Sequence, residues 1–351
     1  MESILKTIIT RNQTADLLKG LAVIFMIQVH IMEQFSSIAT NNSVLGRIFY
    51  FLGGPFCAPV FLAVMGYFLA VSKQSFWFFI KRGLFLFFSG ILLNIGRSFH
   101  LLITIIQGTY NLDPLFFIFG ADILTLAGLS IILLASLRLI SQKNLFLYVP
   151  ILILFAVLSN LISIDNQTQN LYLNFIIGKS DPSYFPLFPW FSYVVAGYIF
   201  KIVYDKFQNS FKPFNVIHWF FIGLLSLLIL VFSPYSFNIS NELTTYYHHT
   251  FFFFLWAIGF MLLYILAINY LHNKIKNTKL IYFLSWTGKN VTAIYIIQWI
   301  IIGNIATAIY RTQNLLESEL WFVGITISSC LLAYVYLKII DYYKNTNKEI
   351  L

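Results

Sequence analysis

The sequence predicts an all-α integral membrane protein, a single domain (residues 1–351) folded as a bundle of about ten transmembrane helices. Of the 351 residues, 59% are hydrophobic and only 10% are charged, whereas soluble domains carry about 25% charged residues. The mean hydropathy of +0.80 means that folding in water would leave much apolar surface exposed. Apolar runs of about 18 residues or more recur along the chain, and each is long enough to cross a bilayer as a helix.

The ten apolar runs follow one another with short polar breaks. In order, they cover approximately residues 16–38, 47–72, 83–106, 116–138, 144–164, 185–204, 214–234, 249–271, 287–310 and 319–341. Turn residues mark several of the breaks: Asn41-Asn42, Gly108 to Pro114, Asp181-Pro182, Asn209 to Pro213 and Ser233-Pro234. No internal repeat separates the runs into two halves, which favours one membrane domain.

The distribution of Lys and Arg predicts the orientation of the helices. If the N-terminus is cytoplasmic and the runs alternate, 18 of the 22 basic residues fall inside. The four that remain outside are Arg47, Arg97, Lys179 and Arg311. Because cytoplasmic loops of membrane proteins are enriched in Lys and Arg, this split predicts that both termini are cytoplasmic.

Composition also excludes several function classes. The net charge of +9 follows from membrane topology, so we expect the lipid bilayer and no nucleic acid as a partner. Cys57 and Cys330 both lie inside apolar runs, which predicts small packing residues rather than a disulfide or a metal site. The absence of organelle signals and the compact size favour the bacterial plasma (cytoplasmic) membrane. The sequence carries no signal for an oligomeric state.

The first apolar run contains ionisable residues, which are costly in a bilayer and are therefore candidates for function. Lys19 and His30 are eleven residues apart, close to three helical turns, so they share one face about 16 Å apart along the axis. Glu33 lies within about 60° of that face. A cation at the cytoplasmic end could hold a phosphate-bearing donor, and the imidazole deeper in could take a proton from an attacking hydroxyl or amine. Glu33, or a carboxylate on a neighbouring helix, could orient the imidazole.

A structural role explains the same histidine equally well. His30 could form a hydrogen bond to another helix and contribute only to packing. The first helix alone does not decide between these two interpretations.

Several motifs resemble those of transmembrane acyltransferases, which include the acyltransferase-three proteins and the heparan-α-glucosaminide N-acetyltransferase-like proteins. Arg11 to His30 is similar to the family's first catalytic helix. In the acyltransferase-three proteins a basic residue, ten residues and a histidine form the hallmark, which Lys19 and His30 match. Further similar segments occur in order along most of the chain: Ala58 to Gly66, Lys81-Arg82-Gly83 with Gly90, Asp122 to Gly128, Phe185 to Trp190 with Gly197, and Thr287 to Asn290 with Tyr295.

The resemblance implies transfer of an acyl group, with acetyl-coenzyme A as the expected donor, to a hydroxyl or amine of a sugar or glycan at the outer side. It gives His30 the role of essential base. The chain departs from the acyltransferase-three branch at Phe85, where members often carry a second arginine three residues after the one matching Arg82. The Pro-Trp and Gly-Lys-Asn segments fit the glucosaminide-acetyltransferase-like branch better.

Other polar residues are weaker candidates, and each has a structural alternative. Arg97 and Asp122 could form a buried pair that aligns His30, or one that only joins two helices. Arg82 could bind coenzyme phosphates or anchor the inner leaflet. Lys289 and Asn290 could contact the donor at a helix N-terminus.

At the outer side, Arg47 could bind an acidic glycan or mark the interface. His248 and His249 could bind the acceptor, although the neighbouring tyrosines are also typical of an interfacial aromatic belt. These histidines have no carboxylate at ligand spacing, so no metal is expected.

The leading hypothesis is therefore a membrane acyltransferase with His30 and Glu33 or Asp122 as catalytic residues. In it, Lys19, Arg82, Lys289 and Asn290 bind the donor, and Arg47, Arg97, His248 and His249 bind the acceptor. The alternative is a transporter or flippase for a lipid-linked or small hydrophilic solute. The sequence lacks the paired Gly/Pro-interrupted spans typical of inverted-repeat transporters. A non-catalytic scaffold is a third possibility. Nothing in the sequence identifies the acceptor.

Overall fold

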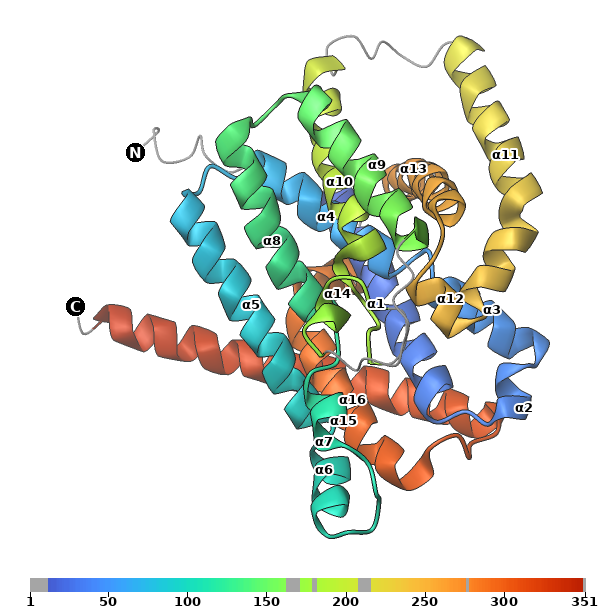
Figure 1. Ribbon diagram of the computed structural model, residues 1–351, viewed down its shortest axis with the longest axis vertical. Coiled ribbons are helices and arrows are strands. Elements are labelled where there is room, and N and C mark those ends of the chain that lie inside the picture. The colour runs from blue at the N-terminus through green and yellow to red at the C-terminus, as the bar shows by residue number, and fades with distance from the viewer. Residues whose placement is uncertain (1–11, 162–170, 179–181, 208–215, 276–277, 350–351) are drawn as a thin grey trace.

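The computed structural model describes residues 12–161, 171–178, 182–207, 216–275 and 278–349. Helices make up most of these ranges (Figure 1). In chain order they are α1 (Gln13–Gln34), α2 (Ile38–Asn41), α3 (Val44–Gly53), α4 (Ala58–Val71), α5 (Phe76–Arg97), α6 (Phe99–Ile106), α7 (Pro114–Ile118), α8 (Ile123–Ile140), α9 (Leu145–Leu161), the 3₁₀ helix η2 (Leu173–Phe175), α10 (Leu187–Phe207), α11 (Val216–Ser240), α12 (Leu243–Tyr247), α13 (Phe251–Lys274), α14 (Lys279–Lys289), α15 (Val291–Ile309) and α16 (Leu315–Glu349).

The helices confirm the predicted all-α membrane bundle. Within the described residues, nine segments are long and apolar enough to cross a bilayer, and α9 contributes a shorter apolar helix. Each of the ten predicted runs corresponds to one of these segments. Both of the cysteines are free, as the sequence predicts.

Several predicted helices are interrupted where the sequence was expected to continue, two of them well inside the run. The run 47–72 breaks between α3 and α4, at residues 54–57, and the run 83–106 breaks at Ser98, between α5 and α6. In the first break, Pro55 has no backbone N–H to donate to a helix. Both breaks line a cavity, as Gly54, Cys57 and Ser98 show. Non-helical backbone is tolerated at membrane depth in such places, because it is shielded from lipid.

Helix α1 lies at the centre of the bundle, with α14 against it (Figure 1). Its apolar window is 72% buried, against 11% for α11 and 17% for α16. A Cβ atom added to Gly20 would lie 2.0 Å from the carbonyl oxygen of Leu284, and one added to Gly288 would lie 1.9 Å from that of Asp16. These glycines therefore allow α1 and α14 to pack backbone to backbone, as small residues do in membrane helix pairs.

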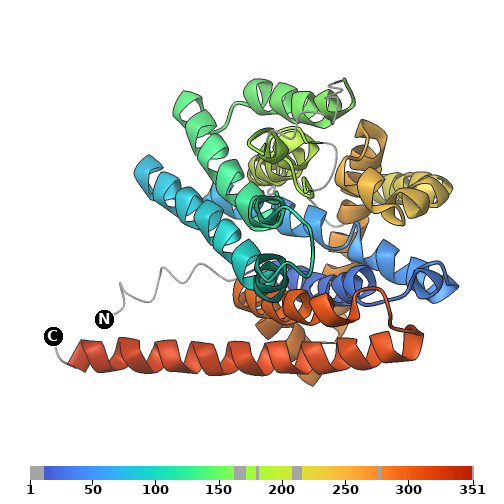
Figure 2. The same ribbon diagram turned by 60° about the horizontal axis from the view of Figure 1, so that its bottom comes forward.

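The outermost helices are α11 and α16. Helix α16 runs along one side of the bundle and packs on α15 and α1 (Figure 2). Large apolar side chains such as Trp219, Phe220, Leu320 and Leu331 are exposed on these two helices, which is the expected composition of a surface that contacts lipid.

Candidate functional site

A cavity of about 1060 Å³ extends through the middle of the bundle. Helices α1, α4, α5, α8 and α15 supply much of its lining, together with the loops that follow α3 and α15. Lys19 and Arg82 lie at one end of the cavity, which we call the Lys19 end. The ammonium group of Lys19 lies there over the ring of Phe68, near the end of α4. Tyr310 and Arg311 lie at the other, the Arg311 end, beside the C-terminus of α1. His30 and Glu33 line the cavity between them.

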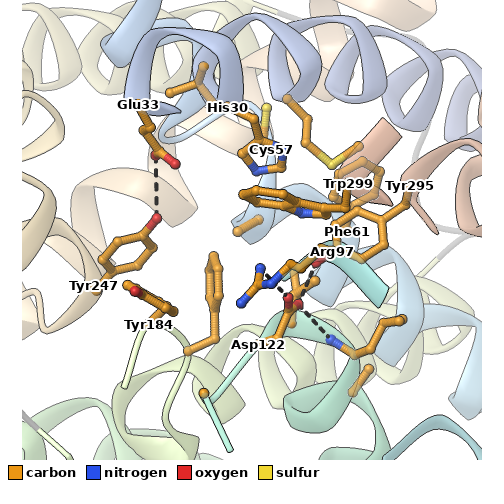
Figure 3. Close-up of a pocket in the computed structure, with 18 of the residues that line it drawn as sticks. His30, Glu33, Cys57, Phe61, Arg97, Asp122, Tyr184, Tyr247, Tyr295 and Trp299 are labelled. Carbon is orange, nitrogen blue, oxygen red and sulfur yellow. Dashed lines mark hydrogen bonds and ion pairs between the residues drawn. The ribbon is translucent and has the colours of Figure 1, made fainter. Parts of the chain in front are cut away.

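His30 is held by two consecutive residues of α15. Its Nδ1 atom is 3.3 Å from Oε1 and 3.1 Å from Nε2 of Gln298, whose side chain is fully buried. Its ring also packs on the indole of Trp299, with 4.0 Å between the ring centroids (Figure 3). Nε2 of His30 forms no hydrogen bond with the described residues. The imidazole is thus fixed through one nitrogen and one face, while the other nitrogen remains available.

A buried polar cluster adjoins this histidine (Figure 3). Arg97 forms an ion pair with Asp122 at 3.0 Å, and its guanidinium lies 4.8 Å from the centroid of the Trp299 ring. Asp122 also accepts a hydrogen bond from the hydroxyl of Tyr295 and caps the N-terminus of α8 through the backbone N–H of Leu124. The expected pair between Arg97 and Asp122 is therefore present, and the Trp299 ring lies against both Arg97 and His30.

The close approach of α15 to α5 depends on a glycine. A Cβ atom on Gly303 would lie 2.3 Å from the carbonyl oxygen of Arg97. The absence of a side chain there lets α15 pack directly on the end of α5, which brings Trp299 under the guanidinium of Arg97.

Glu33 faces the cavity one turn after His30 on α1. It is buried, and its Oε1 atom accepts a hydrogen bond of 3.4 Å from the hydroxyl of Tyr247 (Figure 3). Its partner is therefore a tyrosine of α12 and not His30, and the nearest polar group to Nδ1 of His30 is an amide rather than a carboxylate.

The Lys19 end of the cavity is basic. Lys19 forms an ion pair with Asp16 at 3.1 Å, and Arg82 is exposed in the first half of α5. Both side chains line the same cavity as His30. The prediction that Lys19, His30 and Glu33 share one face of the first helix agrees with this arrangement.

Five predicted site residues lie outside the cavity lining. Arg47 is exposed, donates a hydrogen bond to Asn238 and lies over the ring of Phe237. The sequence places Lys289 at a helix N-terminus, but it is exposed at the C-terminus of α14. Asn290 is the N-cap of α15, and its side chain donates to the carbonyl of Trp286. His248 is half-buried, whereas His249 is fully buried. The roles predicted for these residues stay predictions.

The structure adds three residues that the sequence analysis did not select: Gln298, Trp299 and Arg311 line or support the cavity. A search for every polar residue inside an apolar run, rather than for ionisable residues only, would have identified Gln298 on α15. No comparable signal marks Trp299, because tryptophan is common in membrane helices.

Comparison with known proteins agrees with this geometry. A family model described as an acyltransferase domain, acyltransferase-3, matches residues 12–338. No curated protein and no solved structure matches the chain. Because the family model covers nearly the whole chain, including every residue that lines the cavity, the chain belongs to the acyltransferase-3 family and is a membrane acyltransferase.

Proposed function

We propose that the protein transfers an acetyl group from cytoplasmic acetyl-coenzyme A to a hydroxyl or amine of a sugar or glycan at the outer face of a bacterial plasma membrane. Both termini are then cytoplasmic, and the Lys19 end of the cavity opens inward. The observation that carries the proposal is the continuity of the cavity, which exposes Lys19 and His30 to one space. Their separation along α1 is about 16 Å, the length scale of a pantetheine arm.

Lys19 and Arg82 are the donor-binding residues in this proposal. Both carry positive charge toward the inner end of the cavity, where the phosphates of the coenzyme would enter. Lys19 is largely shielded from bulk water, which strengthens its interaction with phosphate. Arg82 is exposed and adds positive charge at the entrance. Lys289 and Asn290 do not line the cavity, so they belong to this binding site only if the donor extends beyond it.

His30 acts as the general base. If Nδ1–H donates to Oε1 of Gln298, then Nε2 carries the lone pair and faces the acceptor. As the acceptor oxygen or nitrogen attacks the thioester carbonyl, its proton passes to Nε2. The C–S bond then breaks, and the protonated imidazole returns the proton to the coenzyme thiolate. Holding both substrates in one cavity supplies the advantage of proximity.

The attack places negative charge on the carbonyl oxygen of the donor, and this charge needs a hydrogen-bond donor. Apart from a weak interaction with the hydroxyl of Tyr295, the buried Nε1 of Trp299 forms no hydrogen bond with the described residues, although its ring packs on His30 and lines the cavity. A buried N–H whose acceptor is poorly aligned is costly. We therefore assign the Trp299 indole N–H as the oxyanion donor.

The proposal is tested by following radiolabelled acetyl-coenzyme A with purified protein in nanodiscs. Wild-type protein is expected to bind the donor and to release or transfer its acetyl group. His30→Ala should bind the donor with similar affinity and lose the reaction, while the matched control His100→Ala should behave as wild type because His100 is exposed and outside the cavity lining. Full activity of His30→Ala would overturn the assignment of the base. Absence of donor binding at near-millimolar concentration would overturn the acetyl-coenzyme A proposal and favour a transporter.

A further inference from the structure

Arg311 is fixed at the mouth of the cavity by its backbone. The loop between α15 and α16 is joined to the end of α1 by three backbone hydrogen bonds: Arg311 N–H to Gln34 O (3.1 Å), Gln313 N–H to Phe35 O (2.9 Å) and Ser37 N–H to Gln313 O (2.8 Å). Because Gln34 follows Glu33 directly, this attachment holds the arginine beside the last turn of the helix that carries His30.

The backbone conformation of Arg311 is unusual. Its φ angle of +54° is the one positive φ among the described non-glycine residues. Glycine or asparagine normally occupies this region, because a Cβ atom makes it unfavourable. Strained residues of this kind persist where the surroundings hold them, and they concentrate at functional sites. Arg311 therefore adopts an unfavourable backbone conformation, and this conformation determines where its side chain lies.

The charge of Arg311 has no counter-ion in the part of the chain that the structure describes. Of the other basic side chains that line the cavity, Lys19 and Arg97 form ion pairs with Asp16 and Asp122, and Arg82 lies at the opposite, Lys19 end. The guanidinium of Arg311 instead lies over the ring of Tyr310, 5.1 Å from its centroid, and is exposed. An exposed, positioned guanidinium at a cavity entrance is suited to bidentate recognition of a carboxylate or phosphate.

We propose that Arg311 forms an anion-binding subsite for the acceptor, so that the acceptor is a sugar that carries a carboxylate or a phosphate. This inference rests on the proposed function, because it takes the Arg311 end of the cavity as the acceptor side. Tyr184 and Tyr247 line the cavity and stack edge to face with their ring centroids 5.5 Å apart, which gives the sugar ring an aromatic wall. The subsite replaces Arg47 as the cation that selects an acidic acceptor, since Arg47 is turned toward Phe237 and Asn238.

Glu33 offers a structural explanation for the same charge. It lies close enough to Arg311 for a long-range electrostatic interaction, but the two do not form an ion pair. If Arg311 served only to balance Glu33, direct contact would be favoured, because a buried carboxylate gains most from a charge-assisted hydrogen bond. Glu33 bonds to Tyr247 instead, which leaves the guanidinium free to meet a ligand.

The test is a saturation-transfer NMR titration of protein in zwitterionic nanodiscs, without coenzyme A. The probes are D-glucuronate, glucose 1-phosphate and neutral glucose. Wild-type protein is expected to bind at least one of the two anionic sugars about tenfold or more tightly than glucose. The anion with the higher affinity identifies whether the subsite recognises a carboxylate or a phosphate. Arg311→Gly should remove this preference without harming the fold, because glycine accepts the positive φ. Arg311→Lys should keep part of it, and Arg47→Ala should keep all of it.

Equal binding of the three sugars by wild-type protein would overturn the subsite, and so would an anion preference that survives in Arg311→Gly. The outcome is separable from that of the proposed function, because His30→Ala must retain the anion preference. Acetyl transfer without an anion preference refutes the subsite alone. An anion preference without any acetyl transfer refutes the proposed function and leaves the anion site in place.

Discussion

Two histidines of this bundle, His30 and His249, occupy opposite kinds of environment. His249 lies in the loop between α12 and α13 and is fully buried. Its Nε2 is 3.0 Å from the hydroxyl of Tyr193, and its Nδ1 is 2.8 Å from the carbonyl oxygen of Tyr246. Trp190 and Phe253 pack around its ring. His30, in contrast, uses one nitrogen for a protein contact and lines a large cavity.

The number of ring nitrogens that bond to the protein distinguishes a histidine that can react from one that is structural. Proton transfer needs a ring nitrogen that a substrate can reach, and His249 has both nitrogens committed to the protein. From sequence, His30 was a candidate base inside the first apolar run and His249 a candidate acceptor-binding residue at the outer edge of another, and neither pattern showed which ring nitrogens are free. The local environment distinguishes them, because a histidine that joins three segments contributes to stability and one that borders a cavity can contribute to chemistry.

The roles assigned to His30 and His249 are tested most directly by making the same substitution at both positions. His30→Gln should lower the rate of acetyl transfer about 10²- to 10⁴-fold if His30 is the general base we propose, and should change the Tm little. His249→Gln should lower the Tm through loss of buried hydrogen bonds, worth about 1–3 kcal/mol when a partner is left unsatisfied. Its rate per folded molecule should stay near that of wild type. A normal rate for His30→Gln, or a large rate loss at full stability for His249→Gln, would reverse the two assignments.

Trp299→Phe tests whether the indole N–H next to His30 contributes to catalysis. Phenylalanine keeps an aromatic ring against His30 and Arg97 but removes the indole N–H. If that N–H stabilises the oxyanion, kcat should fall about 10²- to 10³-fold with little change in KM for the donor. Trp286→Phe is a suitable control, since Trp286 packs near Tyr334, away from the cavity lining. An unchanged kcat for Trp299→Phe would limit the residue to packing.

Gln298 tests whether the position of His30 depends on a hydrogen bond or only on packing. Gln298→Glu preserves an acceptor for Nδ1–H, so it should hold the same tautomer and retain most of the activity. Gln298→Met has a similar length but no acceptor, and kcat should fall about 10- to 100-fold, as for other residues that orient a functional histidine. Steady-state kinetics of the two variants, with circular dichroism to confirm folding, make the comparison. Equal rates would show that Trp299 alone positions the ring.

The sequence predicted the helices of the bundle well, because the hydropathy of a segment alone determines whether that segment can span a membrane. Every predicted apolar run corresponds to a helical segment, since a segment in lipid must satisfy its own backbone hydrogen bonds. The face shared by Lys19, His30 and Glu33 was predictable for the same reason, as helical spacing alone determines it.

Contacts between helices were harder to predict from the sequence. The pairing of Arg97 with Asp122 could be proposed because ionisable side chains inside a membrane usually pair with an opposite charge. The neighbours of His30 could not, because Gln298 and Trp299 are 268 and 269 positions away in the chain. They come to His30 through the packing of α15 on α1 and on α5. Arg311 was missed because its importance lies in a φ angle and in three backbone hydrogen bonds, which composition and periodicity do not encode.

The last prediction concerns pH and returns to His249. Burial lowers its pKa from 6.5 to about 3, so the folded protein keeps it neutral where the unfolded chain takes up a proton. The contribution to the free energy of unfolding is therefore complete above pH 6.5. It falls by about 1.4 kcal/mol per pH unit as the pH drops from 6.5 toward 3. Thermal unfolding in detergent between pH 7.5 and 4.5 should show this decline for wild-type protein, and a shallower one for His249→Gln. Parallel curves for the two proteins would mean that His249 is protonated at little cost in the folded state, and that its hydrogen bonds to Tyr193 and Tyr246 rearrange to accept the charge.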